Sequence, residues 1–318
     1  MNNIAIGVLA FNEEKHISTV LDNLVELDLP IYIINDASTD NTKKIIESYA
    51  KNYKIRNINN PINLGAGHST LKLLETVRQE GFEFLVKIDG DNQFKTDDIK
   101  KIINIYKKSK FDFIKSNRFW ENGIEGSIPL KRYFGNLLAT IFFQFASGTN
   151  KLFDPLNGLF GVNVKILDLI NFKKFPKRYG YPFYISVLSV ISFLKTYQIN
   201  NTVVYKDQNS YLSSLRVLKI IISLTFHFYI LKIKTKIKFG KFQRSAFIDI
   251  VFLFMLLITF IFLIRTLLIF SSISYFSTSN LLLWLLLLLI LFIATSFIFI
   301  ESFKEERDIR DSYIENEE

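Results

Sequence analysis

Two carboxylate residues directly follow, in the sequence, a short and mostly apolar segment at residues 84–88. The residues that follow this segment are Asp89, Gly90, Asp91, Asn92 and Gln93. Side chains two positions apart on a strand point the same way, so Asp89, Asp91 and Gln93 can direct three oxygen atoms at one point. Mg²⁺ or Mn²⁺ is held in this way, by a few protein oxygens together with the phosphates of a substrate. The alternative is a polar turn after a buried strand, because Asp, Gly and Asn are frequent turn residues.

Short apolar segments alternate with helical patterns over the first part of the chain. We expect strands at residues 4–9, 31–34, 55–58 and 84–88, with helices between them. This alternation predicts an α/β fold, a doubly wound and mostly parallel sheet with helices on both faces. Ligands of such sheets bind beyond the carboxyl ends of the strands. Three strands end there in polar residues, which are Asn12 with Glu13, Asn35 with Asp36, and Asp89 with Asp91.

A loop with two glycines, Gly65 and Gly67, opens the helix expected at residues 69–80. Glycines allow the backbone to come close to a ligand. A phosphate-binding P-loop would carry a lysine before its last hydroxyl residue, and this chain has His68 there. A tight turn before a helix is the alternative.

The C-terminal part of the chain contains two long apolar segments, at residues 247–264 and 281–300. A helix of about 20 residues spans the hydrocarbon core of a membrane, so both segments are candidate spans. Arg265 follows the first segment, where its side chain can reach the interface. Buried core helices are the alternative, although neither segment has a polar face.

Basic residues lie on the outer flanks of the two segments, whereas the linker 271–280 carries no charge. They are Lys232, Lys234, Lys236, Lys238, Lys241 and Arg244 before the first segment and Lys304, Arg307 and Arg310 after the second. The positive-inside rule then puts both flanks in the cytoplasm. No signal-peptide pattern precedes residue 4, so we expect a cytosolic N-terminal domain.

The net charge is +9, and much of it lies beside the apolar segments. This position favours anionic lipid headgroups over nucleic acid as the partner of the basic residues. The chain has no cysteine, which excludes disulfides, thiolate nucleophiles and cysteine zinc sites. Its three histidines are too scattered to indicate a histidine metal site.

The order of four motifs resembles the family 2 glycosyltransferases of the GT-A fold. The motifs are AFNEE at 10–14, NDASTDNT at 35–42, NLGAGHS at 63–69 and DGDNQ at 89–93. Together with the two apolar segments, they make the chain similar to the polyprenyl-phosphate glycosyltransferases, of the dolichol-phosphate mannose synthase type. The resemblance extends from residue 4 to about residue 300.

The resemblance implies a site for a nucleotide sugar, with Asp89, Asp91 and Gln93 as the element that binds the diphosphate and its metal. A metal there neutralises the charge that develops on the leaving diphosphate. Leu9 stands where the family often has Pro, and Asn35 where it often has a first Asp. The implied donor-binding residues are Leu9, Phe11, Glu13, Asn35, Asp36, Gly65, Asp89, Gly90 and Asp91.

For the acceptor, the resemblance implies that Arg118 and Arg132 hold a lipid phosphate, with Lys131 as a substitute for Arg132. A guanidinium suits phosphate oxygens because it donates two parallel hydrogen bonds. A surface salt bridge is the alternative for each arginine. Asp154 is a candidate for positioning the acceptor or acting as a base, although a phosphate with a second pKa near ~6 needs no base.

We therefore expect a cytosolic GT-A domain at 1–210, amphipathic basic helices at 211–244, two spans at 245–301 with an external loop at 271–280, and a charged cytosolic tail at 302–318. The expected reaction is inverting transfer of one sugar from a UDP- or GDP-sugar to a polyprenyl phosphate, at the cytoplasmic face of the inner membrane.

Other functions stay open. A different lipid or glycan acceptor is one alternative, and an inactive nucleotide-binding scaffold is another. A processive polysaccharide synthase is disfavoured because the Gln-x-x-Arg-Trp motif is absent. The resemblance also leaves open whether the protein is a monomer or a homo-oligomer.

Overall fold

The structure is a computed structural model that describes residues 3–120, 124–125, 130–204, 214–239, 243–271 and 278–317. The chain divides into two compact units. The first unit comprises Met1–Phe228 and Asp311–Glu318, and the second comprises Tyr229–Arg310. The side chains of Lys131 and Arg132, and most of the linker 271–280, lie outside the described residues.

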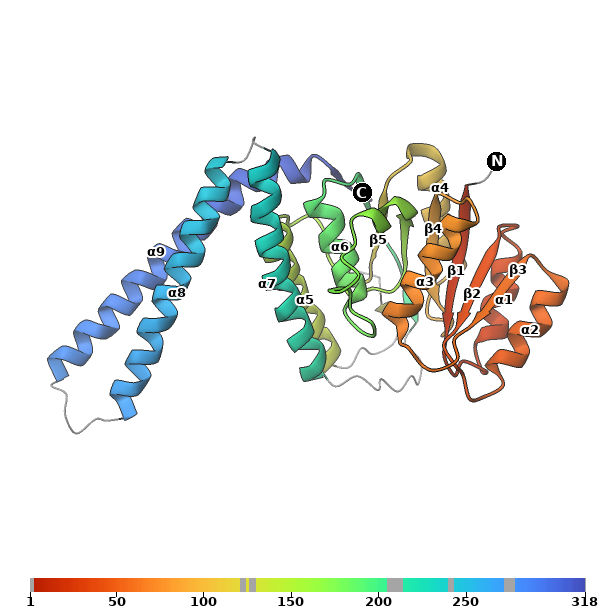
Figure 1. The fold of residues 1–318 in the computed structure, drawn as a ribbon, viewed down its shortest axis with the longest axis horizontal. Helices are drawn as coiled ribbons and strands as arrows, with labels where there is room; N and C mark the ends of the chain where they lie inside the picture. The colour runs from red at the N-terminus through yellow and green to blue at the C-terminus, as the bar shows by residue number, and fades with distance from the viewer. Residues whose placement is uncertain are drawn as a thin grey trace. The chain divides into compact units, whose positions relative to one another are not determined.

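A mixed eight-stranded sheet forms the centre of the first unit among the described residues (Figure 1). Its strand order is β10-β8-β5-β7-β4-β1-β2-β3. β7 is antiparallel to its neighbours β4 and β5, and the other pairs are parallel. The predicted mostly parallel α/β sheet is confirmed. The strands are β1 (Ile4–Ala10), β2 (Ile31–Asn35), β3 (Ile55–Asn59), β4 (Phe84–Asp89), β5 (Phe113–Asn117), β7 (Phe160–Asn163), β8 (Thr196–Asn200) and β10 (Ile314–Asn316).

Helices cover both faces of this sheet, which is why its central strands are apolar in nearly every position. On one face, Val86 and Ile88 share a core with residues of α1 and α4. On the other face, Leu85 and Leu73 of α3 both lie close to Gly7. The helices of the first unit are α1 (Ile17–Val25), α2 (Thr42–Asn52), α3 (Ala66–Gln79), α4 (Thr96–Ser109), α5 (Leu130–Ser147), α6 (Tyr181–Ile191) and the first part of α7 (Ser214–Phe239).

Two short elements complete the first unit. β6 (Ile124–Glu125) pairs with β9 (Val203–Val204), and a 3₁₀ helix occupies Val164–Asp168. Strand periodicity puts Leu85, Lys87 and Asp89 on one face of β4, the face that α3 covers. The side chain of Asp89 therefore belongs to the face opposite the α1 and α4 layer.

The C-terminal residues differ from the expected charged tail. After α9 the chain forms β10, which pairs in parallel with β8 at the edge of the sheet. Ile314 is buried there, and the backbone N–H of Asn200 donates to Glu317 Oε2 at 2.6 Å. Lys151 Nζ donates to the backbone oxygen of Asp311 at 2.9 Å. Only three residues form the strand, too few for an alternating pattern to be recognised among charged neighbours.

The second unit contains the end of α7 and two long helices, α8 (Gln243–Ser271) and α9 (Thr278–Asp311). Both long helices have the length and composition of membrane spans, over Ser245–Leu267 and Trp284–Asp311, with mean hydropathies of 3.0 and 2.5. Only 11% of each apolar stretch is buried within the protein. This exposure is unlike that of a soluble core helix, which would be mostly buried.

Buried ion pairs join the three helices of the second unit. Lys236 Nζ lies 2.5 Å from Asp249 Oδ2 and 2.6 Å from Glu306 Oε2, and Lys232 Nζ lies 3.2 Å from the same Glu306 oxygen. We expected both lysines to meet lipid headgroups, but they are at most 2% exposed. Lys234 and Lys238 are exposed. Residues 232 and 236 are four positions apart and share the buried face of α7, whereas residues 234 and 238 lie on its exposed face.

Candidate active site

Three carboxylates from two strand ends lie close together at the carboxyl edge of the sheet. Asp89 ends β4, Asp91 follows it, and Glu13 comes from the loop after β1. Burial and the neighbouring charges of Asp91 and Asp89 raise the pKa of Glu13 to about 7. Burial, and then repulsion from Asp89, raises the pKa of Asp91 to about 7 as well. The cluster thus carries negative charge that a bound cation would relieve.

These residues fit a divalent cation whose coordination is shared with a substrate. Within the described part of the chain, no three His, Cys, Asp or Glu side chains are arranged to hold a metal by themselves. Mg²⁺ and Mn²⁺ accept carboxylate and amide oxygens, and Mg²⁺ sites typically use one or two carboxylates plus substrate phosphates. Asp91 and Asp89 supply such oxygens. The Gln93 backbone N–H donates to Asp91 Oδ1 at 3.2 Å, which bends the chain after the cluster.

Lys87 is a site residue that the sequence analysis did not single out. Its side chain is completely buried, and its Nζ lies 2.5 Å from Asp89 Oδ1 and 2.6 Å from the Tyr181 hydroxyl. Burial alone would lower the pKa of Lys87, but the charge of Asp89 outweighs it and raises the pKa. One oxygen of Asp89 is therefore held by an ammonium. A lysine inside an apolar strand, two positions before Asp89, was the available signal.

The loops after β1 and β2 are tied to one another by hydrogen bonds. The Asn12 backbone N–H donates to Ser38 Oγ at 3.0 Å, and the Thr39 backbone N–H donates to Asn12 Oδ1 at 2.8 Å. The Glu13 backbone N–H donates to Thr42 Oγ1 at 2.8 Å. Phe11 is 44% exposed between them, whereas Leu9 is buried. These hydrogen bonds fix the two loops to one another, and the side chain of Phe11 remains accessible to solvent.

Asp36 is buried, and its carboxylate is already surrounded by donors. Its Oδ1 accepts from Asn60 Nδ2 at 2.7 Å and from the Leu64 N–H at 3.0 Å, and its Oδ2 accepts from the Gly65 N–H at 2.8 Å. Asn35 donates through Nδ2 to Asn59 Oδ1 at 2.8 Å. Asp36 thus holds the loop that precedes α3, whereas Asn35 ties the end of β2 to the end of β3. Their predicted contact with a nucleotide stays a prediction.

The two loop glycines are explained by contacts within the protein. A Cβ at Gly67 would lie 1.9 Å from the backbone oxygen of Pro176, and one at Gly65 would lie 2.8 Å from that of Lys177. Gly65 also has φ = +95°, a conformation that favours glycine. The His68 backbone N–H donates to the Lys177 oxygen at 2.8 Å. The geometry thus matches the tight-turn alternative, packed against residues 176–178.

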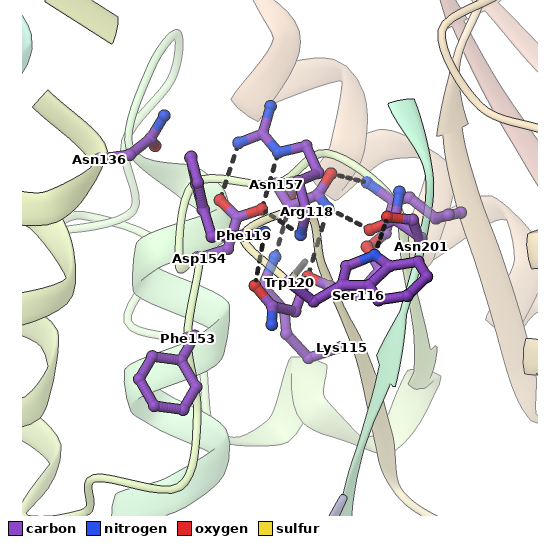
Figure 2. Close-up of polar contacts among 12 residues, drawn as sticks. Lys115, Ser116, Arg118, Phe119, Trp120, Asn136, Phe153, Asp154, Asn157 and Asn201 are labelled. Atoms are coloured by element: carbon purple, nitrogen blue, oxygen red, sulfur yellow. Dashed lines mark hydrogen bonds and ion pairs between the residues drawn. The ribbon is translucent and has the colours of Figure 1, made fainter. Parts of the chain in front are cut away.

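Arg118 follows the end of β5 and forms a two-point ion pair with Asp154 (Figure 2). Its Nε lies 2.7 Å from Asp154 Oδ2, and its Nη2 lies 2.7 Å from Oδ1. Asp154 is completely buried. A buried carboxylate that accepts two hydrogen bonds from one guanidinium fixes the orientation of that guanidinium, which suits a positioning role. The structure places Lys131 and Arg132 in the first turn of α5.

A buried polar network lies beside this pair, as Figure 2 shows. Lys115 Nζ donates to the Asn157 backbone oxygen at 2.8 Å, and Asn157 Nδ2 donates to Asn201 Oδ1 at 3.0 Å. Burial lowers the pKa of Lys115 to about 7. Asn136 of α5 has a buried amide oxygen without a hydrogen-bond partner in the described structure. Such a group is one that a ligand or a water molecule can satisfy.

The sequence profile of Glycosyl transferase family 2 matches residues 5–170, just over half of the chain. The chain therefore belongs to this family and is a glycosyltransferase. The matched region contains β1 to β7 and every residue predicted to bind the donor. The resemblance seen in the four motifs is confirmed.

Two relatives illustrate the similarity to known proteins. An uncharacterized protein of Methanocaldococcus jannaschii is 33% identical over 142 residues, which cover 43% of this chain and 59% of that protein. The UDP-N-acetylglucosamine–dolichyl-phosphate N-acetylglucosaminyltransferase of Methanococcus voltae is 27% identical over 190 residues, covering 55% of this chain and 75% of the relative. Other relatives are named as a polysaccharide synthase and a teichoic acid polymerase, so family membership alone does not define the acceptor.

A solved structure shares the fold. The glucosyl-3-phosphoglycerate synthase of Mycobacterium tuberculosis, in complex with Mn²⁺, UDP-glucose and phosphoglyceric acid, aligns with a TM-score of 0.54 at 15% identity. The alignment covers 70% of this chain and 79% of that one. The predicted GT-A fold is thereby confirmed. The ligands named in that complex belong to that enzyme.

Proposed function

We propose that this protein transfers one sugar from a UDP- or GDP-sugar to a polyprenyl phosphate at the cytoplasmic face of a membrane. The observation that carries the proposal is the combination, in one chain, of an acidic cluster at the carboxyl edge of the sheet, an arginine at the end of β5 and two exposed apolar helices of spanning length. Each part alone is compatible with other acceptors. Together they suit a reaction between a charged soluble donor and a charged lipid.

On the donor side, Asp91 and Asp89, with Gln93 and Glu13 beside them, would hold a divalent cation and the donor diphosphate. The cation supplies neutralisation of charge on the leaving nucleoside diphosphate. Lys87 keeps Asp89 in one orientation and offsets part of its charge, so the repulsion between Asp89 and the diphosphate is smaller. Phe11 offers an exposed ring on which a nucleotide base can stack.

On the acceptor side, Arg118, with Arg132 or Lys131 on α5, would hold the lipid phosphate. The phosphate oxygen is already ionised near neutral pH, so it can attack the anomeric carbon without a protein base. In-line attack inverts the configuration at that carbon. Asp154 orients Arg118 in this scheme, and holding two anionic reactants together lowers the barrier through proximity.

The exposed apolar helices support a membrane location. α5 exposes one apolar face in the first unit, and α7 exposes Ile222 and Phe226 one turn apart. Such faces are typical of helices that lie in the membrane interface. The residues on the α5 face are Tyr133, Phe134, Leu137, Leu138 and Ile141.

The position of β10 supports cytosolic termini on the same side. β10 and β1 are strands of one sheet, and α8 and α9 separate them in the chain. A chain that returns to the same sheet crosses a membrane an even number of times. Two spans with basic outer flanks therefore agree with an inner-membrane protein whose catalytic unit is cytosolic.

Lipid extraction of radiolabelled product tests the proposal. Membranes that contain the protein are incubated with Mn²⁺ or Mg²⁺, undecaprenyl phosphate and a panel of labelled UDP- and GDP-sugars. We expect cation-dependent radiolabel in the lipid extract with one donor, and roughly 100-fold less or lower in membranes that carry Asp91→Ala. Label in a polymer or in another glycolipid would instead establish one of the alternative acceptors.

A further inference from the structure

One short loop touches both halves of the site. Residues 154–158, here called the 154–158 loop, run from Asp154 to Gly158 between α5 and β7. At its start, Asp154 holds Arg118 through the two-point ion pair and also accepts from the Arg118 backbone N–H at 3.1 Å. At its end, Gly158 lies against the carboxylate of Asp89. This short loop thus joins the acceptor arginine to the metal-site carboxylate.

The contact at Gly158 leaves no room for a side chain. A Cβ at this position would lie 2.2 Å from Asp89 Oδ2 and 3.3 Å from Lys87 Nζ. The backbone of Gly158 is not in the left-handed region that favours glycine. A larger residue would therefore be excluded by the close contact with Asp89 and not by backbone strain. Asp89 is therefore confined on two sides, by Lys87 at one oxygen and by the loop backbone at the other.

The middle of the loop is anchored to the sheet by two buried side chains. Lys115 Nζ donates to the Asn157 backbone oxygen, and Asn157 Nδ2 donates to the Ser116 backbone oxygen at 3.2 Å and to Asn201 Oδ1. Asn157 is completely buried, and Lys115 is 1% exposed. Displacing the loop would cost these bonds, so the loop holds a single position.

We propose that the 154–158 loop couples the donor and acceptor halves of the site, with Asn157, Lys115 and Gly158 as positioning residues. This inference rests on the proposed function for the roles of Asp89 and Arg118. A shift of the loop moves Asp89 and Arg118 together, so loss of its anchor changes the binding of both substrates. Groups that orient metal ligands in this way typically change metal affinity roughly 10- to 100-fold when removed.

Binding of UDP or GDP with Mn²⁺, whichever nucleotide the wild-type protein binds, tests the donor half without turnover. We expect Gly158→Ala to raise the dissociation constant about tenfold or more. Gly135→Ala is the matched control, because a Cβ at Gly135 meets nothing within 4 Å. Equal nucleotide affinity in Gly158→Ala and Gly135→Ala would overturn the inference.

Asn157→Ala tests the coupling, because Asn157 contacts neither Asp89 nor Arg118 in the hydrogen bonds described. We expect the nucleotide dissociation constant and the KM for undecaprenyl phosphate both to rise about tenfold. Asp154→Asn should raise the acceptor KM with little change in nucleotide binding. A purely structural role of Asn157 would lower the unfolding temperature and leave both binding constants within about twofold, which would refute the coupling.

Lys115→Met is a second variant for the case in which Asn157→Ala does not fold, and the same paired rise is expected. The donor half stays informative if the acceptor is another molecule. Wild-type protein that transfers no sugar to undecaprenyl phosphate would refute the proposed acceptor. A weakened nucleotide affinity in Gly158→Ala and Asn157→Ala would still support the role of the loop at Asp89.

Discussion

Lys87 and Lys115 are buried lysines on neighbouring parts of the same sheet, and their surroundings give them opposite properties. Both residues pair in register with Phe160 of β7, Lys87 from β4 and Lys115 from β5. Lys87 contacts a carboxylate directly, and its charged form is stabilised. Lys115 contacts a backbone oxygen, and burial favours its neutral form. The partner of each lysine thus determines whether its side chain is favoured in the charged or the neutral form.

Replacing Asp91 tests the metal site. Asp91→Ala should reduce cation-dependent transfer by roughly 100-fold or more, the scale of removing one group that stabilises developing charge. Sugar transfer at saturating Mn²⁺ is the measurement, with membrane insertion checked in parallel. Asp97→Ala is the control, because the Asp97 side chain is 85% exposed. Turnover like that of the wild type in Asp91→Ala would exclude Asp91 as a metal ligand.

Replacing Arg118 tests the acceptor site. Arg118→Ala should raise the KM for the lipid phosphate more than the KM for the donor, since a guanidinium binds phosphate oxygens directly. This variant also leaves Asp154 buried without its partner, which is destabilising. The double variant Arg118→Ala/Asp154→Ala removes that charge. An acceptor KM that returns to the wild-type value in the double variant would contradict a direct contact between Arg118 and the phosphate.

The titration of Lys115 makes stability depend on pH. Its pKa is about 7 in the folded protein, against 10.5 for an unperturbed lysine. Between these values the unfolded chain binds a proton that the folded protein lacks, so stability rises with pH by up to ~1.4 kcal/mol per unit. Lys115→Met should lose this rise. Unfolding temperatures at pH 7 and pH 9 provide the measurement, and parallel curves for both proteins would contradict it.

At the scale of elements, segments distant in sequence position the loop that leads into α3. The loop before α3 is shaped by residues 176–178, and Asp36 holds the same loop from the other side. Gly65 and Gly67 allow this loop to pack closely against residues 176–178. The backbone N–H groups of Gly67 and His68, in the first turn of α3, donate to the backbone oxygens of Arg178 and Lys177 and are therefore already satisfied within the protein.

Adding one methyl group to Gly67 tests that packing. Gly67→Ala would bring its Cβ to 1.9 Å from the Pro176 backbone oxygen, and backbone atoms cannot rotate away. We expect a loss of stability of roughly 1–3 kcal/mol, as for overpacked sites. The apparent unfolding temperature in detergent measures it against Gly135→Ala. Equal temperatures would show that residues 176–178 are not held against this glycine.

The elements themselves were largely predictable from the sequence. Strand and helix alternation predicted β1 to β4 within two residues at their ends, because burial on both faces makes these strands continuously apolar. The same alternation, with polar residues at the strand ends, predicted that Asp89, Asp91 and Glu13 meet at one edge of the sheet. Lys87 was not singled out, although a lysine inside an apolar strand, two positions before Asp89, was a local signal. Asn157 and Gly158 were not identified, since their partners Lys115 and Asp89 come from other segments and no local pattern reports such contacts.

At the scale of the whole molecule, the chain begins and ends in one sheet. Residues 229–310 form a separate compact unit, and the chain then returns to the sheet as β10. Because β10 belongs to the same sheet as the N-terminal strands, it must lie on the same side of a membrane as those strands. The expected tail is therefore part of the folded catalytic unit.

Single introduced cysteines can test this topology, because the chain has none of its own. Ser274→Cys in the linker should react with a membrane-impermeant maleimide in intact cells. Glu315→Cys, which is exposed on β10, should react only after lysis. Labelling of Glu315→Cys in intact cells would refute the proposed cytosolic C-terminus, and protection of Ser274→Cys would refute the external linker.

The sequence by itself determined the fold class, the family and the acidic cluster, because these depend on local periodicity and on the order of short motifs. Only the tertiary structure showed that Lys87 holds Asp89, that Asp154 is the partner of Arg118, and that Lys232 and Lys236 are buried. The same is true of β10 at the edge of the sheet. The physical reason is that charge pairing and burial depend on which distant residues meet, and the sequence pattern around each residue does not contain that information.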